Sequence, residues 1–312
     1  MKKFRVIVTG SNSFGVGESI VKIVNRSRYR DDVELVCTSC YDMFYVGHLV
    51  DEKHVIPSTD SSGYENSIKN LYRQGVINII IPGSEGETAF FATRRENFPD
   101  FAFLMNDREI IRVFSDKLRA ARLFPDYFPP TDERHQAFSQ SHYPLVKKKR
   151  FGKGSEGITV LFKEKEIEEG TGFIFQQFIG GEEFTASLIC QIDGTLQMIV
   201  TRRVLRKGAT VKAEVVREQG LEEWMRALGK EVIETIGPFK VLNLQFRRNN
   251  RELKLLEINP RISGSTSMRA LFGYNKFDIL LENTILNRTS PIINIMDGLR
   301  AVRGYEERIE SD

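Results

Sequence analysis

The chain has 312 residues, which is room for about two compact domains and for a core that needs no disulfide or metal staple. Its 45 Lys and Arg residues against 42 Asp and Glu residues leave a net charge of +3, too small to favour a dedicated nucleic-acid or membrane binder. No apolar run approaches the ~18 residues of a membrane span, and the N-terminal apolar stretch is too short for a signal peptide. We therefore expect a cytoplasmic protein.

The first hundred residues alternate between strand-like and helix-like patterns. Apolar, β-branched runs predict strands over 5–9, 33–37, 76–81 and 101–105. Segments between them predict helices over 18–25, 64–73 and 87–96. Strands joined through helices form parallel sheets, so this part is predicted to be an α/β domain. A longer helical pattern over 107–124 leads to prolines at 125, 129 and 130, which indicate a boundary.

After these prolines, strands follow one another with short turns. Strands are predicted over 143–148, 158–162, 173–178, 183–190 and 195–200, with Asp193-Gly194 as a hairpin turn between the last two. Helices are predicted over 221–236 and 266–283. Strands over 241–246 and 253–258 flank a second hairpin turn at 248–251. Antiparallel strands with intervening helices are typical of an α+β unit.

Two sequence features have a structural interpretation that competes with a functional one. The turn Thr9-Gly10-Ser11-Asn12-Ser13-Phe14-Gly15-Val16-Gly17 follows a strand and opens a helix, where backbone N–H groups can bind phosphate. Its spacing does not match G-x-G-x-x-G, so a turn that needs small residues is favoured over a dinucleotide site. Cys37 and Cys40 have Cys-x-x-Cys spacing but lack a second ligand pair, so the end of a buried strand is favoured over zinc.

A basic run, Lys147 to Arg150, enters a loop with the sequence Phe151-Gly152-Lys153-Gly154-Ser155-Glu156-Gly157. A basic run alone is most often a solvated face. Here it ends a strand and continues into a Gly/Ser loop, which together offer positive charge and exposed backbone donors. That combination suits a polyphosphate, although the Walker pattern is absent.

A third cluster lies on the predicted hairpin near the C-terminal end. Glu257 and Asn259 are two residues apart on one strand and therefore point to the same face. If the hairpin turns at 248–251, Gln245 lies opposite Glu257. One carboxylate and two amide oxygens form a hard ligand set that suits Mg²⁺. The alternative is the polar outer face of an amphipathic hairpin.

The order of these segments carries a family resemblance. They are Ser115-Asp116-Lys117, the strand ending at Lys148, the Gly/Ser loop, Phe175 to Thr185, Leu242 to Phe246, and Leu256-Glu257-Ile258-Asn259-Pro260-Arg261. This order resembles the ATP-grasp superfamily, in particular the branch with the large subunit of carbamoyl-phosphate synthetase and related carboxylate–amine ligases. The resemblance implies a Rossmann-like pre-ATP-grasp domain over 1–112, a lid subdomain over 113–180 and a C-terminal subdomain with the metal site over 181–312. The fold class is thus α/β plus α+β.

The resemblance also implies a role for each matching residue. Around ATP, Lys117 and Lys148 would contact the phosphates, Gly152, Gly154 and Ser155 would form the loop over them, Gln176, Gln177, Phe178 and Ile179 would meet adenine, and Glu183 would accept from the ribose. For the chemistry, Gln245, Glu257 and Asn259 would bind Mg²⁺, with Mn²⁺ as an alternative, while Arg261 and Lys148 would be catalytic. Strand alternation puts Lys147 and Lys149 opposite Lys148, so a register error of one residue would exchange their roles.

The expected activity is that of an ATP- and Mg²⁺-dependent, ADP-forming ligase, which activates a carboxylate as an acyl phosphate for attack by an amine or amino acid. The basic stretch 201–212 suggests an acidic substrate, with Arg203, Lys212 and Arg261 as candidate substrate residues; a solvated basic ribbon is the alternative. A kinase, a nicotinamide-dependent dehydrogenase that uses the N-terminal turn, and a non-catalytic ATP-binding regulator stay open. Partners are expected to be small molecules, not nucleic acid or membrane, and a homodimer stays open.

Overall fold

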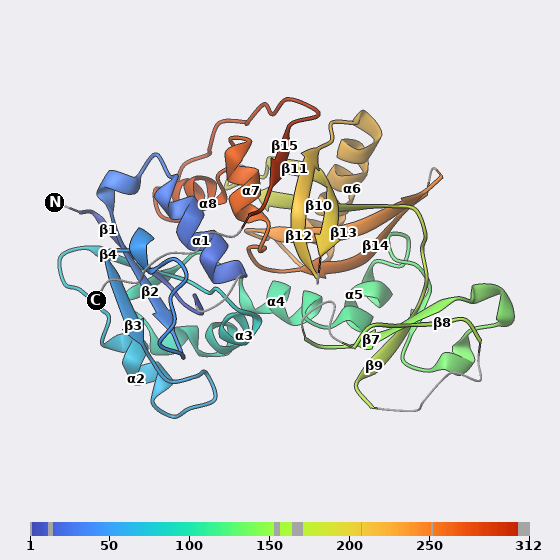
Figure 1. Cartoon of the computed structure of the whole chain (residues 1–312), viewed down its shortest axis with the longest axis horizontal. Helices are drawn as coiled ribbons and strands as arrows, with labels where there is room; N and C mark the ends of the chain where they lie inside the picture. The colour runs from blue at the N-terminus through green and yellow to red at the C-terminus, as the bar shows by residue number, and fades with distance from the viewer. Residues whose placement is uncertain are drawn as a thin grey trace.

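The computed structural model describes residues 2–11, 15–152, 157–163, 171–206, 208–250 and 252–304, and within these residues the strands form three sheets (Figure 1). A parallel sheet near the N-terminus lies at the left of the view. A six-stranded sheet lies at the upper right, and a smaller four-stranded sheet projects at the lower right. The predicted fold class, α/β plus α+β, is confirmed.

The first sheet is parallel, with the strand order β3-β2-β1-β4-β5. Its strands are β1 (Phe4–Val8), β2 (Val33–Ser39), β3 (Glu52–Val55), β4 (Ile77–Ile81) and β5 (Phe101–Phe103). The helices between them are α1 (Val16–Asn25), α2 (Tyr64–Lys69) and α3 (Glu85–Arg94). β3 was not predicted, because this edge strand carries the charged sequence Glu-Lys-His and has no buried residue.

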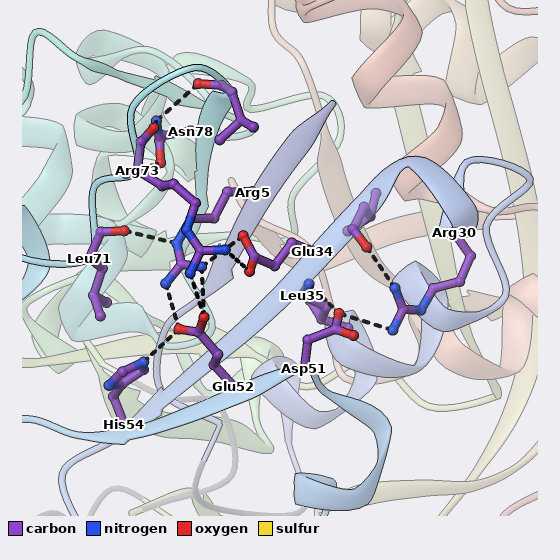
Figure 2. A network of polar contacts seen from close by, with 12 residues as sticks. Arg5, Arg30, Glu34, Leu35, Asp51, Glu52, His54, Leu71, Arg73 and Asn78 are labelled. Carbon is purple, nitrogen blue, oxygen red and sulfur yellow. Dashed lines mark hydrogen bonds and ion pairs between the residues drawn. The ribbon is translucent and has the colours of Figure 1, made fainter. Parts of the chain in front are cut away.

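A network of ion pairs joins three strands of this sheet (Figure 2). The Arg5 side chain on β1 is buried, and its guanidinium lies 2.8 Å from a Glu34 oxygen on β2 and 2.6 Å from a Glu52 oxygen on β3. Its Nε donates to the Leu71 carbonyl oxygen at 2.9 Å. Arg73 pairs with the same two carboxylates from the solvent side. A buried guanidinium is tolerated here because the network satisfies it with two carboxylates and a carbonyl.

The chain leaves the first sheet through two helices rather than one. α4 (Arg108–Phe114) and α5 (Lys117–Leu123) replace the single helix predicted over 107–124. Asp116 is the N-cap of α5, and its side chain accepts from two backbone N–H groups of the first turn at 3.1 and 3.2 Å. An N-cap residue has extended rather than helical backbone, so this cap divides the apolar pattern into two helices.

The four-stranded sheet has the order β6-β9-β7-β8. Its strands are β6 (Thr131–Asp132), β7 (Leu145–Lys149), β8 (Thr159–Leu161) and β9 (Phe173–Gln177). Its buried core is small and consists of Leu145, Leu161 and Phe175. Gly154 and Ser155, predicted to cover the phosphates, lie outside the described residues.

The six-stranded sheet has the order β14-β13-β10-β11-β12-β15. Its strands are β10 (Glu182–Cys190), β11 (Leu196–Arg206), β12 (Ala209–Val215), β13 (Leu242–Asn249), β14 (Glu252–Asn259) and β15 (Arg300–Val302). Three helices accompany it: α6 (Gln219–Thr235), α7 (Thr266–Leu271) and α8 (Lys276–Thr284). The helix predicted over 266–283 is divided at Gly273, which has φ +88°, and at the N-cap Asn275. β12 and β15 were not predicted.

The first and the six-stranded sheets share one apolar core. Ile20 and Val24 of α1 belong to the same buried cluster as Met268 of α7 and Phe277 of α8. In Figure 1, α1 lies beside α7 at the centre of the molecule. The loops at the start of α1 are therefore held against the C-terminal half.

Short 3₁₀ helices lie in the connections: η1 (Arg30–Asp32), η2 (Gly47–Leu49), η3 (Arg95–Asn97), η4 (His135–Ala137) and η5 (Gln140–His142). Within the described residues, no helix has the length and apolar character that crossing a membrane requires.

Candidate functional site

A cavity of about 590 Å³ lies where the three sheets meet. Most of the predicted site residues line it: Lys117, Lys148, Gln176, Gln177, Phe178, Ile179, Glu183, Arg203, Gln245, Glu257, Asn259 and Arg261. Gly152 is not part of the wall, although its carbonyl oxygen accepts from Lys117 Nζ at 2.8 Å. Lys212 is exposed on β12 and does not line the cavity, so the structure does not bring it to the other candidate substrate residues.

Lys148 on β7 is buried inside this cavity. Its Nζ donates to Gln176 Oε1 at 2.8 Å and to the Leu256 carbonyl oxygen at 2.7 Å, which connects the four-stranded sheet to β14. Burial lowers the pKa of Lys148 to about 8; Glu257 opposes this shift, and the positive charge of Lys117 adds to it. An anion placed beside this ammonium would stabilise its charged form, as a phosphate contact requires.

The neighbouring lysines are less buried than Lys148, although Lys149 also borders the cavity. Lys147 Nζ lies 4.8 Å from the centre of the Phe173 ring, and the side chain of Lys149 is exposed. This is the alternation predicted for the strand, in which Lys148 alone of the three is buried. The geometry therefore favours Lys148 as the phosphate-contacting lysine, a role that stays a prediction.

The candidate metal ligands meet on one face of the hairpin of β13 and β14. Gln245 pairs with Glu257 in the register of the two strands, as predicted, and Asn259 Nδ2 lies 2.9 Å from Glu257 Oε1. The described residues contain no group of three or more His, Cys, Asp or Glu side chains that could hold a metal ion. A cation here would thus need amide oxygens and ligand oxygens beside the Glu257 carboxylate, which is the donor set that suits Mg²⁺.

Arg203 forms a hydrogen bond with one of these candidate metal ligands, Gln245. Its Nη2 donates to Gln245 Oε1 at 2.6 Å and to Glu183 Oε1 at 2.5 Å. A cation bound by Gln245 would have to replace this hydrogen bond. Asn259 would likewise have to give up the hydrogen bond that its Nδ2 donates to Glu257 Oε1, so that the amide oxygen can face the ion.

Glu183, predicted to meet the ribose, lies between two arginines. Burial favours its neutral form, but the charges of Arg203 and Arg247 outweigh burial and hold the pKa of Glu183 below its ordinary value. Arg247 also donates to the Ile179 carbonyl oxygen at 2.9 Å, and its guanidinium lies 5.4 Å from the Phe178 ring centre. One side chain, Arg247, therefore holds both the Glu183 carboxylate and the segment 178–179 that was predicted to meet adenine. The sequence analysis did not identify Arg247 as a site residue.

The sequence contains a pattern from which Arg247 could have been predicted as a site residue. It follows Gln245 by two residues on the same strand, and side chains at i and i+2 share a face. Arg303 was also missed; it follows the short strand β15 and lines the cavity at the end nearest the first sheet. No motif marks Arg303, because it reaches the site only through the sheet pairing of β15 with β12.

The N-terminal glycines are explained by close packing. A Cβ built on Gly83 would lie 2.0 Å from the Thr9 carbonyl oxygen, and one on Gly17 would lie 2.5 Å from the Gly10 carbonyl oxygen. Gly10 itself has φ +61°. These contacts support the interpretation that the turn needs small residues, although residues 12–14 lie outside the described part of the chain.

The cysteine pair shows no metal site. Cys37 is buried in β2, where burial raises the pKa of its thiol to about 12, and Cys40 is exposed beyond the strand end. A thiol with this pKa stays protonated at neutral pH, and thiolate is the form that binds zinc.

Comparisons with known proteins agree with this geometry. Residues 114–265 match the family model of the ATP-grasp domain, so this part of the chain is an ATP-grasp domain. A search of curated proteins finds no match.

Solved structures share the fold. N5-carboxyaminoimidazole synthetase from Staphylococcus aureus, in complex with ADP, is similar with a TM-score of 0.72 and 16% identity, over 94% of this chain and 80% of that one. The L-amino acid ligase from Bacillus licheniformis has a TM-score of 0.68 and 16% identity, over 91% and 74%. Biotin carboxylase from Campylobacter jejuni has a TM-score of 0.69 and 16% identity, over 91% and 71%.

Proposed function

We propose that the protein is an ATP- and Mg²⁺-dependent ligase that activates a carboxylate as an acyl phosphate and transfers the acyl group to an amine, with ADP as the nucleotide product. The observation that carries this proposal is the arrangement around Lys148. A buried lysine with a lowered pKa, the four residues predicted to meet adenine (176–179) and the Glu257–Asn259 pair line one cavity. Similar folds in a synthetase and in an amino acid ligase support a C–N bond-forming reaction.

The division of labour follows from the charges. A carboxylate repels the γ-phosphate that it attacks, so the site must screen this repulsion. Lys117 and Lys148 would lie at the phosphates and Arg261 at the transferring group. Glu257 and Asn259 would hold Mg²⁺, which supplies charge neutralisation on the phosphate oxygens when it is bound. The lid subdomain over 113–180, which contains the four-stranded sheet, would keep water from the acyl phosphate. In the chain it lies between the domain over 1–112 and the subdomain over 181–312.

The nucleotide product tests this proposal. The protein is incubated with ATP, Mg²⁺, mixed amino acids and small organic acids, with and without hydroxylamine, which traps acyl phosphates as hydroxamates. We expect ADP, phosphate and a hydroxamate. AMP and pyrophosphate would indicate an acyl adenylate and contradict the proposal.

The same assay separates the other candidate functions. ADP with a phosphorylated hydroxyl compound and no hydroxamate would identify a kinase. ATP binding without turnover over the whole substrate pool would identify a regulator. An enhancement of NADH fluorescence together with no ATP binding would favour the dehydrogenase.

A further inference from the structure

The cavity has more positive than negative side chains. Among the described residues, seven Lys and Arg side chains line it, against the three carboxylates Glu85, Glu183 and Glu257. A Mg²⁺–ATP complex carries about two net negative charges and would neutralise only part of this excess. The remaining positive charge points to a second anionic ligand.

Arg303 supplies part of this positive charge at the cavity wall. Its backbone N–H donates to the Val211 carbonyl oxygen at 2.8 Å, and its side chain donates to the Gly264 carbonyl oxygen. Gly264 in turn packs on the start of α1, since a Cβ built on it would lie 3.6 Å from the Gly15 backbone. No carboxylate of the described residues pairs with Arg303, although it lines the cavity.

Arg261 lies at the same end of the cavity. Among the described residues, its side chain donates one hydrogen bond, to the Ile262 carbonyl oxygen at 3.3 Å. Gly264, which Arg303 contacts, follows Arg261 by three residues, a chain length that spans at most about 10 Å. Both side chains line the cavity, and the backbone groups that they contact, at Ile262 and Gly264, are two residues apart in the chain.

A fully buried arginine lies beneath this region. Arg269 Nη1 donates to Asn243 Oδ1 at 3.1 Å and to Ser263 Oγ at 3.3 Å, and Nη2 donates to Thr185 Oγ1 at 3.0 Å. All three acceptors belong to residues that line the cavity. Thr185 Oγ1 in turn donates to Asn243 Oδ1 at 3.4 Å, and Ser263 Oγ is hydrogen-bonded to Ser265 Oγ at 3.1 Å. The Arg269 guanidinium therefore lies directly behind polar groups of the cavity wall, where its positive charge favours a bound anion.

Lys276 adds a second buried nitrogen. It is 0% exposed, and within the described part of the chain its Nζ has no hydrogen-bond partner. Burial first, and then the charges of Arg269 and Arg261, lower the pKa of Lys276 well below its ordinary value. A buried amine without a partner destabilises the fold. Negative charge bound near Arg261 would offset part of that cost.

We propose that the end of the cavity between Arg261 and Arg303 binds a second anionic group of the substrate, a carboxylate or a phosphate. Arg303 contacts this group directly, and Arg269 is a positioning residue that supplies positive charge behind the cavity wall. The substrate is accordingly a carboxylic acid with a second anionic group a short distance away. The inference rests on the proposed function for the identity of the reacting carboxylate, but the anion site itself does not require turnover.

Binding of simple acids without nucleotide tests the site. Calorimetry and thermal melting are carried out with succinate, which has two carboxylates, phosphoglycolate, which has a carboxylate and a phosphate, and propionate, which has one carboxylate. We expect at least one dianion to bind about tenfold or more tightly than propionate and to raise the melting temperature. A preference for phosphoglycolate would identify the second group as phosphate, and a preference for succinate would identify it as carboxylate.

Substitutions test whether the dianion binds at Arg303. Arg303→Gln should abolish the preference for dianions, and Arg303→Lys should retain part of it. Arg300→Gln is the matched control, because Arg300 lies on β15, three residues before Arg303, but pairs with Glu214 at the surface and does not line the cavity. Lys276→Met should raise the melting temperature of the ligand-free protein, because it removes a buried amine that has no partner among the described residues. If no dianion binds better than propionate, or if Arg303→Gln binds the dianion as wild type does, the inference is overturned.

The ADP assay keeps this outcome separate from the proposed function. Dianion binding that depends on Arg303, without ADP formation for any acid, would retain the anion site and reject the ligase. ADP and hydroxamate formation with monocarboxylates, unaffected by Arg303→Gln, would retain the ligase and reject the second anion site.

Discussion

Replacing Glu52 by Gln tests the ion-pair network of the first sheet and gives a stability effect with a defined pH dependence. Glu52 accepts from Arg5 on β1, from Arg73 and from His54 (Figure 2). The hydrogen bond from Arg5 is the largest effect on the carboxyl group; burial opposes it, and His54 and Arg73 reinforce it. Together they lower the pKa of Glu52 from 4.5 to about 2.

The size of the effect follows from this shift. Each pKa unit corresponds to about 1.4 kcal/mol, so the shift sets an upper limit of about 3 kcal/mol. Because the Glu52 side chain is 29% exposed, solvent screening reduces the expected value to about 1–2 kcal/mol. A carboxyl whose pKa is lowered on folding stabilises the fold at a pH above its unfolded value. This contribution is therefore present above pH 4.5 and is lost as the pH falls towards 2.

Urea unfolding followed by circular dichroism measures this contribution. We expect Glu52→Gln to lower the free energy of unfolding by about 1–2 kcal/mol at pH 7, and the difference from wild type to fall below about half of that by pH 3. Glu109→Gln is the control, because Glu109 pairs with Arg112 at the surface with 49% of its side chain exposed. A difference between wild type and Glu52→Gln that is the same at pH 7 and pH 3 would refute the assignment of the stabilisation to this carboxylate.

Three predictions concern the cavity. Lys148→Met should weaken ATP binding about tenfold or more, whereas Lys147→Met should change it little; calorimetry without Mg²⁺ measures both, and a larger loss at 147 would reject the register. Because the pKa of Lys148 is about 8, the ammonium deprotonates above that value, so ATP affinity should fall from pH 8 to pH 9 in wild type. The affinity of Lys148→Met should stay flat over the same range, and an equal decline in both would exclude Lys148 as the cause. Glu257→Gln should reduce ADP formation about a hundredfold or more at saturating Mg²⁺ with an unchanged circular dichroism spectrum, and a near wild-type rate would reject the metal assignment.

Hydrophobic periodicity was sufficient for the parallel sheet and for the hairpin with the candidate metal ligands. The pairing of Gln245 with Glu257 was predicted from alternation and from the position of the turn, and the structure has it. It also depends on a register shift between Gln245 and Phe246, which the sequence did not indicate: with Asn249 opposite Glu252, a regular ladder would bring Leu256 opposite Gln245. Strands that are short, charged or at an edge were missed. β3 and β15 are of this kind, since they are defined by the partner strand more than by their own residues.

The hydrogen-bond partners of the arginines in the site could not be predicted from sequence alone. Arg203, Arg247 and Arg303 come from different strands, and their partners depend on how the sheets pack together. Arg203 was predicted to bind the substrate, which stays a prediction, and in the structure it donates to Glu183 and Gln245. Long side chains reach several partners, so strand alternation fixes their face but not their contact.

The two ends of the cavity differ in how a ligand would bind. At the Lys148 end, the polar groups already satisfy one another: Lys148 bonds to Gln176 and the Leu256 carbonyl oxygen, and Arg203 bonds to Glu183. A nucleotide there exchanges one hydrogen bond for another, so its affinity is the difference between two favourable states. At the Arg303 end, the described residues provide no carboxylate partner, and an anion would add an interaction without breaking a comparable one. Charge at that end should therefore discriminate between substrates more strongly than contacts at the nucleotide end, which every ATP-dependent reaction of this cavity would share.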